Sequence, residues 1–232
     1  MRIFVTAGNT QTPIDRVRCI TNIFTGRTGA AIAAEAHRRG HHVAIATSRP
    51  EVTAPILSER WSCVSYRTFD ELAALMAAHV PNSEVVIHCA AVSDYHAAGI
   101  YAPAPGTTFD GPRWTGDAMM LDRSAGKVKS DAPELWLRLV RAPKLVDKIR
   151  TDWSFRGFLV KFKLEVGITE DALQLVAEKS RQQSSANWMV ANTLEGSADW
   201  ALIGNAAGYR KVVRADLPRT LFDVIEKEAA GA

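Results

Sequence analysis

The chain lacks the features that mark several large protein classes. It has three cysteines, Cys19, Cys63 and Cys89, which lie far apart and without the Cys or His spacing of a zinc site. No stretch approaches the ~18 consecutive apolar residues of a membrane-spanning helix. The first residues carry no basic segment followed by a long apolar run. We therefore expect a cytoplasmic protein in a reducing compartment, with no membrane partner.

The chain also has no large excess of positive or negative charge. The formal net charge is +3 over 232 residues, and the Lys and Arg residues are scattered along the chain. This pattern predicts no nucleic-acid partner and is compatible with small substrates that carry phosphate. Apolar residues make up 47% of the chain, which is enough for one sizeable core. We expect a single domain over residues 1–232.

The apolar pattern predicts an α/β fold. Apolar runs at 2–7, 42–47 and 84–91 are typical of buried strands, and residues 28–39 and 69–79 have helical spacing. Their alternation predicts a doubly wound, mostly parallel, Rossmann-like sheet with helices on both faces. The elements expected further along are strand 135–140, helix 143–150, strand 158–164, helix 169–183 with Thr169 as its N-cap, strands 188–191 and 209–213, and helix 221–229.

Residues 96–126 interrupt this alternation. The segment is rich in Pro, Gly, Ala, Thr and Asp and shows no sustained period. We expect a long loop or flap here. Long loops in compact domains often carry function.

The first strand ends at Gly8, and open α/β sheets bind ligands beyond the carboxyl ends of their strands. The next glycines, Gly26 and Gly29, stand where the first helix begins. Their spacing matches neither the dinucleotide fingerprint nor the Walker loop. Glycines there let an anion approach the helix N-terminus, but a role in a turn or in packing is an equally simple interpretation.

Two later segments place polar groups beside small residues. Ala90 and Ala91 leave backbone groups accessible at a strand end, and Asp94 can accept hydrogen bonds from a ligand. Tight packing and an Asx turn are the alternatives. Lys127 and Lys129 alternate, so they share one side of an extended segment, which suits stabilisation of a polyphosphate or a solvated surface.

Taken together, these segments resemble the phosphopantothenate–cysteine ligases (phosphopantothenoylcysteine synthetases), the CoaB-like family of the DNA/pantothenate metabolism flavoprotein C-terminal domain. Residues 6–29 follow the family pattern TxGGTxxxIDxVRxIxNxSxGxxG. Later segments are similar to AAV(A/S)DY, KIKS, TPxI(I/L), GFKLE and ADLIVAND, at 89–95, 126–130, 142–146, 161–165 and 186–192. The chain departs from the pattern at Asn9, Phe24, Lys144, Lys161, Asn187 and Thr193.

The resemblance implies a stand-alone, monofunctional ligase of coenzyme A biosynthesis that condenses (R)-4'-phosphopantothenate with L-cysteine. CTP or ATP would activate the carboxylate as an acyl-nucleotidylate with release of pyrophosphate, and CMP or AMP would leave when the amine attacks. Mg²⁺ would bind mainly through the nucleotide phosphates. No flavin is expected, and a homodimer is implied.

The resemblance also assigns roles to residues. Asn22 and Lys127 are the implied catalytic residues. Phosphopantothenate would contact Asn22, Ala90, Ala91 and Asp94. The implied nucleotide-binding residues are Gly8, Gly26, Gly29, Asp94, Lys127, Pro143, Lys144, Leu145, Val146, Phe162, Lys163 and Lys179. From local sequence alone, Phe162 is equally typical of a core residue and Lys179 of a solvated helix face.

Two other functions fit part of the pattern. A short-chain-type NAD(P)-dependent oxidoreductase would share the first strand and the Ala-rich helix, but its clustered glycines and Tyr-x-x-x-Lys pair are missing. A non-catalytic nucleotide-binding paralogue would explain the departures. The retention of Asn22, Asp94 and Lys127 argues against the paralogue.

Overall fold

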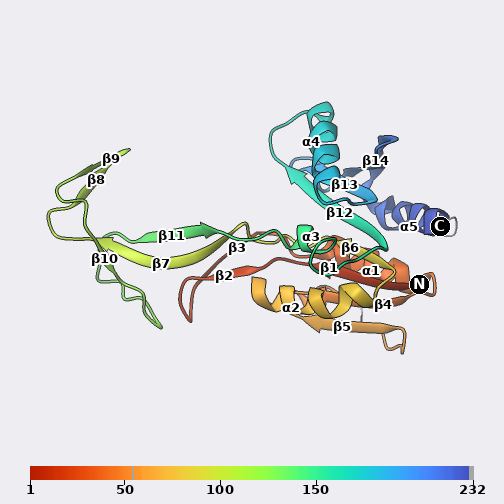
Figure 1. The fold of residues 1–232 in the computed structure, drawn as a ribbon, viewed down its shortest axis with the longest axis horizontal. Coiled ribbons are helices and arrows are strands. Elements are labelled where there is room, and N and C mark those ends of the chain that lie inside the picture. Colours follow the sequence, from red (N-terminus) through yellow and green to blue (C-terminus); the bar gives the residue numbers. More distant parts are fainter. Residues whose placement is uncertain (54, 230–232) are drawn as a thin grey trace.

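The computed structural model describes residues 1–53 and 55–229, and an eight-stranded sheet lies at its centre (Figure 1). The strand order is β15-β14-β13-β12-β6-β1-β4-β5. Six strands are parallel, and β14 and β15 join antiparallel at one edge. The strands are β1 (Arg2–Ala7), β4 (His42–Thr47), β5 (Trp61–Ser65), β6 (Val85–His88), β12 (Phe158–Glu165), β13 (Trp188–Thr193), β14 (Trp200–Asn205) and β15 (Gly208–Val213).

The chain winds outward from β1 in both directions, first through β4 and β5 and then through β6, β12 and β13. This is the topology of a doubly wound sheet, and the predicted fold class is confirmed. Its switch point lies between β1 and β6, where the two crossover directions diverge. Ligands of such sheets bind in the crevice at the carboxyl ends of these strands.

Helices cover both faces of the sheet because alternate strand residues are apolar on both sides. Ile3 and Val5 pack with α1 (Arg27–Arg38) and α5 (Leu217–Ala229) on one face. Phe4 and Leu159 pack on the other with α2 (Phe69–His79) and α3 (Leu145–Lys148). On this second face α4 (Glu170–Gln183) covers Met189. Short 3-10 helices are η1 (Pro50–Val52), η2 (Val80–Asn82) and η3 (Arg214–Asp216).

Local signals account for where two helices begin. Thr68 and Glu71 form a capping box at α2, in which the Thr68 hydroxyl accepts from Glu71 N and the Glu71 carboxylate accepts from Thr68 N. Thr169 accepts a hydrogen bond from Ala172 N and caps α4, as predicted. Both caps satisfy backbone N–H groups that have no partner within the helix.

Residues 96–126 are more regular than the loop that their composition predicts. They belong to a β-arm that projects away from the central sheet, on the side opposite to the N-terminus (Figure 1). Three strands form an antiparallel sheet in the order β10-β7-β11. The elements of the arm are β7 (Tyr95–Pro103), β8 (Thr108–Asp110), β9 (Arg113–Thr115), β10 (Met120–Asp122) and β11 (Trp136–Arg141).

The arm has its own small apolar contacts. Phe109 and Trp114, on the β8–β9 hairpin, pack with Trp136 at ring-centroid distances of 4.7–5.0 Å. Near the base of the arm, β2 (Gln11–Pro13) and β3 (Cys19–Thr21) form a second hairpin. Within the described part of the chain, no helix is long and apolar enough to cross a membrane.

Candidate active site

Close packing of α1 against β1 builds the core of the site. Gly26 is the N-cap of α1 at φ +81°, and a Cβ there would lie 2.5 Å from Gly8 N. A Cβ on Gly29 would lie 2.6 Å from Ala7 Cβ. The packing role of both glycines is therefore real. It is compatible with anion binding, because the same contact brings the N-terminus of α1 to the carboxyl end of β1.

Asparagine side chains hold the loop that follows β1. Asn9 is buried, and its Nδ2 donates to Asn22 O at 2.5 Å, while its Oδ1 accepts from Ser48 Oγ at 2.9 Å. Asn22 Nδ2 donates to Ala91 O at 3.1 Å. Ala91 N donates to Gly8 O at 2.8 Å. The carboxyl ends of β1 and β6 and the loop that carries Asn22 thus form one hydrogen-bonded unit.

A cavity of about 250 Å³, called the Gly26 cavity below, opens beside this unit. It brings together six predicted site residues and leaves Asn22 beside its rim through the bond to Ala91. Among the residues that the structure describes, none that lines it is acidic, and three are cationic. The lining residues are Gly8, Phe24, Thr25, Gly26, Arg27, Thr28, Cys89, Ala90, Ala91, Phe162, Lys163, Leu164, Asn192, Ser197 and Arg214.

Asp94 borders a different cavity, of about 670 Å³, together with Pro143 and Lys144. Ala142 N donates to Asp94 O at 2.8 Å, which ties this segment to the end of the β6 loop. The side chains of Leu145 and Val146 are buried in the core beneath α3. The structure therefore does not bring Leu145 and Val146 into this cavity.

Lys127 lies beside a third cavity, which includes Gly126 and the turn between β2 and β3. The segment is held by Asp15, whose Oδ2 accepts from Val128 N at 3.0 Å. Hydrogen bonds from the Arg18 guanidinium and from the backbone N–H groups of Val128 and Val17 keep the pKa of Asp15 well below its usual range. Val128 is buried, and Lys127 and Lys129 are exposed on either side of it. The structure therefore does not bring Lys127 into the cavity beside Gly26.

Several departures from the family pattern have structural partners. Asn187 Oδ1 accepts from Leu159 N and from Arg150 Nη2, both at 2.8 Å. Thr193 Oγ1 accepts from Gly196 N at 3.1 Å. Phe24 lines the Gly26 cavity. The hydrogen bonds account for the local structure at two departures, Asn187 and Thr193, without recourse to a ligand.

Lys161 is buried on the face that α4 covers, and its Nζ donates to Ser180 O at 3.0 Å. Burial lowers the pKa of Lys161 to about 8. Burial, together with the charge of Lys161, lowers the pKa of His88 to about 4. His88 Nδ1 lies 2.9 Å from Thr6 Oγ1 and is neutral near pH 7. The exposed Lys179 on α4 lies outside all of these cavities.

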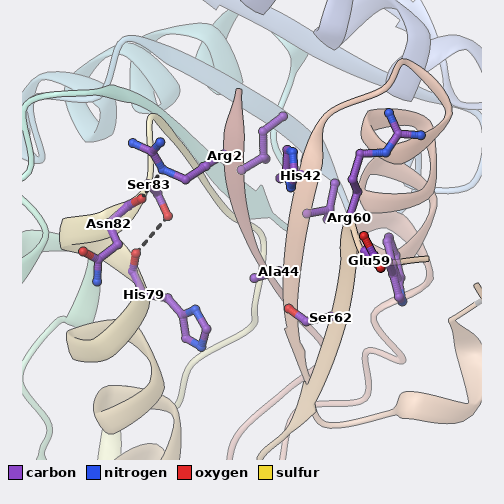
Figure 2. A pocket seen from close by; sticks show the side chains of 12 residues that line it. Arg2, His42, Ala44, Glu59, Arg60, Ser62, His79, Asn82 and Ser83 are labelled. Carbon is purple, nitrogen blue, oxygen red and sulfur yellow. Dashed lines mark hydrogen bonds between the residues drawn. The ribbon is translucent and has the colours of Figure 1, made fainter. Parts of the chain in front are cut away.

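A further cavity of about 260 Å³ lies at the opposite edge of the sheet (Figure 2). Arg2, His42 and Arg60 surround it at the amino ends of β1, β4 and β5. Arg2 Nε donates to Asn82 O at 2.9 Å, and Ser83 Oγ donates to His79 O at 2.8 Å. The cavity is remote in the topology from Gly8 and the switch point.

Sequence reasoning missed six polar residues of the Gly26 cavity: Thr25, Arg27, Thr28, Asn192, Ser197 and Arg214. Asn192 belongs to a segment that follows the family pattern, so the sequence could have identified it as a site residue. Arg214 follows the last strand as an isolated basic residue, and no spacing or motif singles it out.

The N-terminal part of the chain matches the model of a known family. The sequence model described as "DNA/pantothenate metabolism flavoprotein C-terminal domain" matches residues 1–102, which include the Gly8, Asn22 and Ala91 unit. This match covers the N-terminal part of the chain, where the first motifs lie. The resemblance predicted from the motifs is thereby confirmed.

Curated relatives of this CoaB-like family extend the match beyond residue 102. The "Coenzyme A biosynthesis bifunctional protein CoaBC" of Thermococcus kodakarensis is 30% identical over 97% of this chain and 51% of that protein. The protein of the same name from Escherichia coli K12 is 29% identical over 83% of this chain and 41% of that protein. The chain thus spans about half the length of the curated relatives it matches.

Solved structures with the same fold include a family member from Streptococcus pneumoniae described as a DNA/pantothenate metabolism flavoprotein. It has a TM-score of 0.81 and 25% identity, over 98% of this chain and 99% of that chain. A Cab2 mutant in complex with phosphopantothenate-cysteine has a TM-score of 0.71 at 15% identity, over 99% of this chain and 88% of that chain. At this identity, the second likeness shows the fold alone.

The contact between α1 and β1 predicts that Gly26→Ala is more harmful than an alanine in another left-handed position. Gly167 has φ +68° and open space around its Cα, so Gly167→Ala adds only backbone strain of about 1–2 kcal/mol. Gly26→Ala adds the clash with Gly8 and should cost at least about 1 kcal/mol more. Urea unfolding of both variants measures the difference, and equal losses would contradict the packing role.

The buried Lys161 predicts a pH dependence of stability. Its pKa is about 8 in the folded protein and 10.5 ordinarily, so between these values the unfolded chain binds a proton that the folded chain does not. Stability therefore rises as the pH increases from about 8. Lys161→Met should abolish this rise and change the unfolding free energy near pH 7 by on the order of 1 kcal/mol. Urea titrations near pH 7 and 9, with the exposed Lys227→Met as control, test it; an unchanged slope in Lys161→Met would refute it.

Proposed function

We propose that the chain is a phosphopantothenate–cysteine ligase of coenzyme A biosynthesis that acts in the cytoplasm. The observation that carries the proposal is the hydrogen-bonded unit of Gly8, Asn22 and Ala91 at the switch point, beside the N-terminus of α1. The residues that resemble the ligase family most closely meet at the place where this fold binds ligands. The match to the family model and the names of the curated relatives support the same reaction.

In the proposed reaction, the carboxylate of (R)-4'-phosphopantothenate attacks the α-phosphorus of CTP or ATP. Pyrophosphate leaves and an acyl-nucleotidylate forms. The amine of L-cysteine then attacks the acyl carbon, the nucleoside monophosphate leaves with the electron pair of the C–O bond, and the amine loses a proton. Activation is needed because a free carboxylate is a poor electrophile.

The Gly26 cavity suits the nucleotide phosphates. The N-terminus of α1 supplies N–H groups and the positive end of the helix dipole. Arg27, Lys163 and Arg214 supply positive charge, and Phe162 offers an apolar surface to the base or ribose. Electrostatic stabilisation of this kind lowers the free energy of the transition state for attack at the α-phosphorus more than it lowers that of the ground state.

Asn22 is placed to act on the acyl group and the amine. Its Nδ2 is engaged by Ala91 O, and no hydrogen bond of its Oδ1 is found within the described residues. An amide oxygen accepts from an amine N–H and can orient the nucleophile. Ala90 and Ala91 leave room for the pantothenate chain beside it.

Mg²⁺ is proposed to arrive with the nucleotide. Within residues 1–53 and 55–229, no group of three or more His, Cys, Asp or Glu side chains could hold a metal ion. The Gly26 cavity offers hydroxyl and amide oxygens from Thr25, Thr28, Asn192 and Ser197, which suit a hydrated Mg²⁺. Bound there, Mg²⁺ would neutralise phosphate charge.

The arm is proposed to hold a second copy of the chain. Its strand β11 is an edge of the arm sheet, and Leu139 and Val140 are exposed on it. An exposed edge strand with apolar side chains favours pairing with another chain. Lys127, which lies outside the Gly26 cavity, is proposed to reach a cleft through this assembly.

The ligase proposal predicts pyrophosphate release that depends on phosphopantothenate. Purified protein with Mg²⁺, 4'-phosphopantothenate and cysteine should release pyrophosphate with CTP or with ATP, and the comparison gives the nucleotide preference. Lys127→Ala should lower kcat by roughly 100-fold or more if Lys127 stabilises the transition state. Lys129→Ala, which removes an exposed lysine of the same segment, is the matched control and should change kcat little.

Absence of phosphopantothenate-dependent release with either nucleotide would overturn the ligase proposal and favour a non-catalytic nucleotide-binding protein. Unchanged turnover in Lys127→Ala would remove Lys127 from the catalytic residues. An Asn22→Asp variant should accumulate the acyl-nucleotidylate, which mass spectrometry detects, and full turnover in that variant would refute the role of Asn22.

The arm predicts a concentration-dependent homodimer. Leu139→Asp places a charge on the exposed edge and should shift the chain toward the monomer, because a buried carboxylate is costly. Leu57→Asp changes the same residue type at a fully exposed position outside the arm and should leave the mass unchanged. Light scattering after size exclusion measures both. A monomeric wild-type protein at ~100 μM, a concentration chosen well above the μM range of weak complexes, would contradict the dimer.

A further inference from the structure

Arg214 has an unusual environment for an arginine. It opens η3 directly after β15 and lines the Gly26 cavity. Its Nη2 donates to Thr28 Oγ1, and its backbone N donates to Asp199 O at 2.8 Å. Within the described residues, it forms no ion pair with a carboxylate, and its buried Nη1 has no hydrogen-bond partner. The fold thus holds a guanidinium in place without satisfying it.

No neighbouring group offsets this charge. Cys89 lies close enough to favour the charged form of Arg214, but burial raises the pKa of the Cys89 thiol to about 12, so the thiol is neutral near pH 7. Burial also lowers the pKa of Arg214 itself. A buried charge without a partner is costly to the folded protein. Such a cost is typical of groups that wait for a ligand.

The rest of the cavity calls for the same kind of ligand. No side chain caps α1, and its first turn has no acidic residue. Arg27 adds a second positive charge, and Lys163 a third that is shared with Glu165 at 2.8 Å. Several phosphoryl oxygens would accept from the helix N–H groups and offset the charge of the Arg214 guanidinium together. A polyphosphate is therefore the class of ligand that fits.

We propose that Arg214 binds the polyphosphate of the nucleotide through its guanidinium, and that Thr28 positions this group by accepting from Nη2. The proposal rests on the nucleotide dependence proposed above and adds a binding residue that the family motifs do not identify. Arg214 directly follows the last β-hairpin, so the C-terminal part of the chain completes a site that the N-terminal glycines begin.

The test compares Arg214→Met, which keeps most of the side-chain volume, with Arg210→Met, which removes an exposed arginine from β15. Titration calorimetry measures binding of CTP, ATP, inorganic tripolyphosphate and the two nucleosides. Arg214→Met should weaken triphosphate and tripolyphosphate binding by roughly 30-fold or more and leave nucleoside binding within about 3-fold. Arg214→Lys should fall between, because it keeps the charge and loses the fork. Arg210→Met should match the wild type.

Thermal unfolding without ligand separates this role from a structural one. Arg214→Met should unfold at the same temperature as the wild type or a higher one, because the variant removes a buried charge without a partner. It should also lose most of the stabilisation that the triphosphate gives. A lowered unfolding temperature together with equal losses for nucleosides and triphosphates would overturn the proposal in favour of a structural role.

The two proposals fail in different ways. Triphosphate binding that needs Arg214, without turnover of phosphopantothenate, would overturn the ligase reaction and support the role of Arg214. Turnover and triphosphate binding that survive in Arg214→Met would overturn the role of Arg214 alone. A wild-type protein that binds neither triphosphate nor tripolyphosphate would overturn both.

Discussion

The contact between the start of α1 and the end of β1 is the constraint on which the rest of the site depends. Gly26 and Gly29 bring the helix against Gly8 and Ala7 at distances that no side chain allows. At its other end, α1 is joined to α5 by Arg39, which donates to Asp223 and Glu226 at 2.7 Å. The helix is therefore fixed at both ends. Its first residues line a cavity that is also lined by Phe162 and Lys163 of β12 and by Arg214 of η3.

Hydrogen bonds around Asn9 show how one departure from a family pattern can be compatible with the site. A second glycine in that place would leave the loop free, whereas Asn9 is buried and holds both Ser48 and the backbone of Asn22. The position of Asn22 is then determined by side chains rather than by backbone freedom. Preorganisation of this kind lowers the entropic cost of placing a catalytic group.

Much of the central sheet could be predicted because each buried strand carries its own apolar run. The predicted bounds 42–47 and 69–79 match β4 and α2. Of the arm, the strand expected at 135–140 matches β11, but β7 to β10 could not be predicted, because they are stabilised by distant partners, such as Tyr101 opposite Trp136. The motifs identified segments near the carboxyl edge of the sheet, but they could not tell which cavity each segment lines. Hence Gly26 and Asp94 were grouped together although they border different cavities.

Two cations near the carboxyl ends of the sheet strands, the buried Lys161 and the half-buried Arg214, differ in how the fold satisfies them. Lys161 lies on the face covered by α4, and the neutral His88 lies beside it. Its ammonium donates to Ser180 O, so the fold itself supplies a hydrogen-bond acceptor for Lys161. Arg214 lies on the face of α1, and within the described residues its Nη1 finds no acceptor. Desolvation is costly for both, and in the proposal above a polyphosphate supplies the counter-charge that Arg214 does not find among the described residues. The same comparison explains why a pKa shift alone does not identify a site: burial shifts the pKa of both residues, and the unfilled hydrogen-bonding capacity distinguishes them.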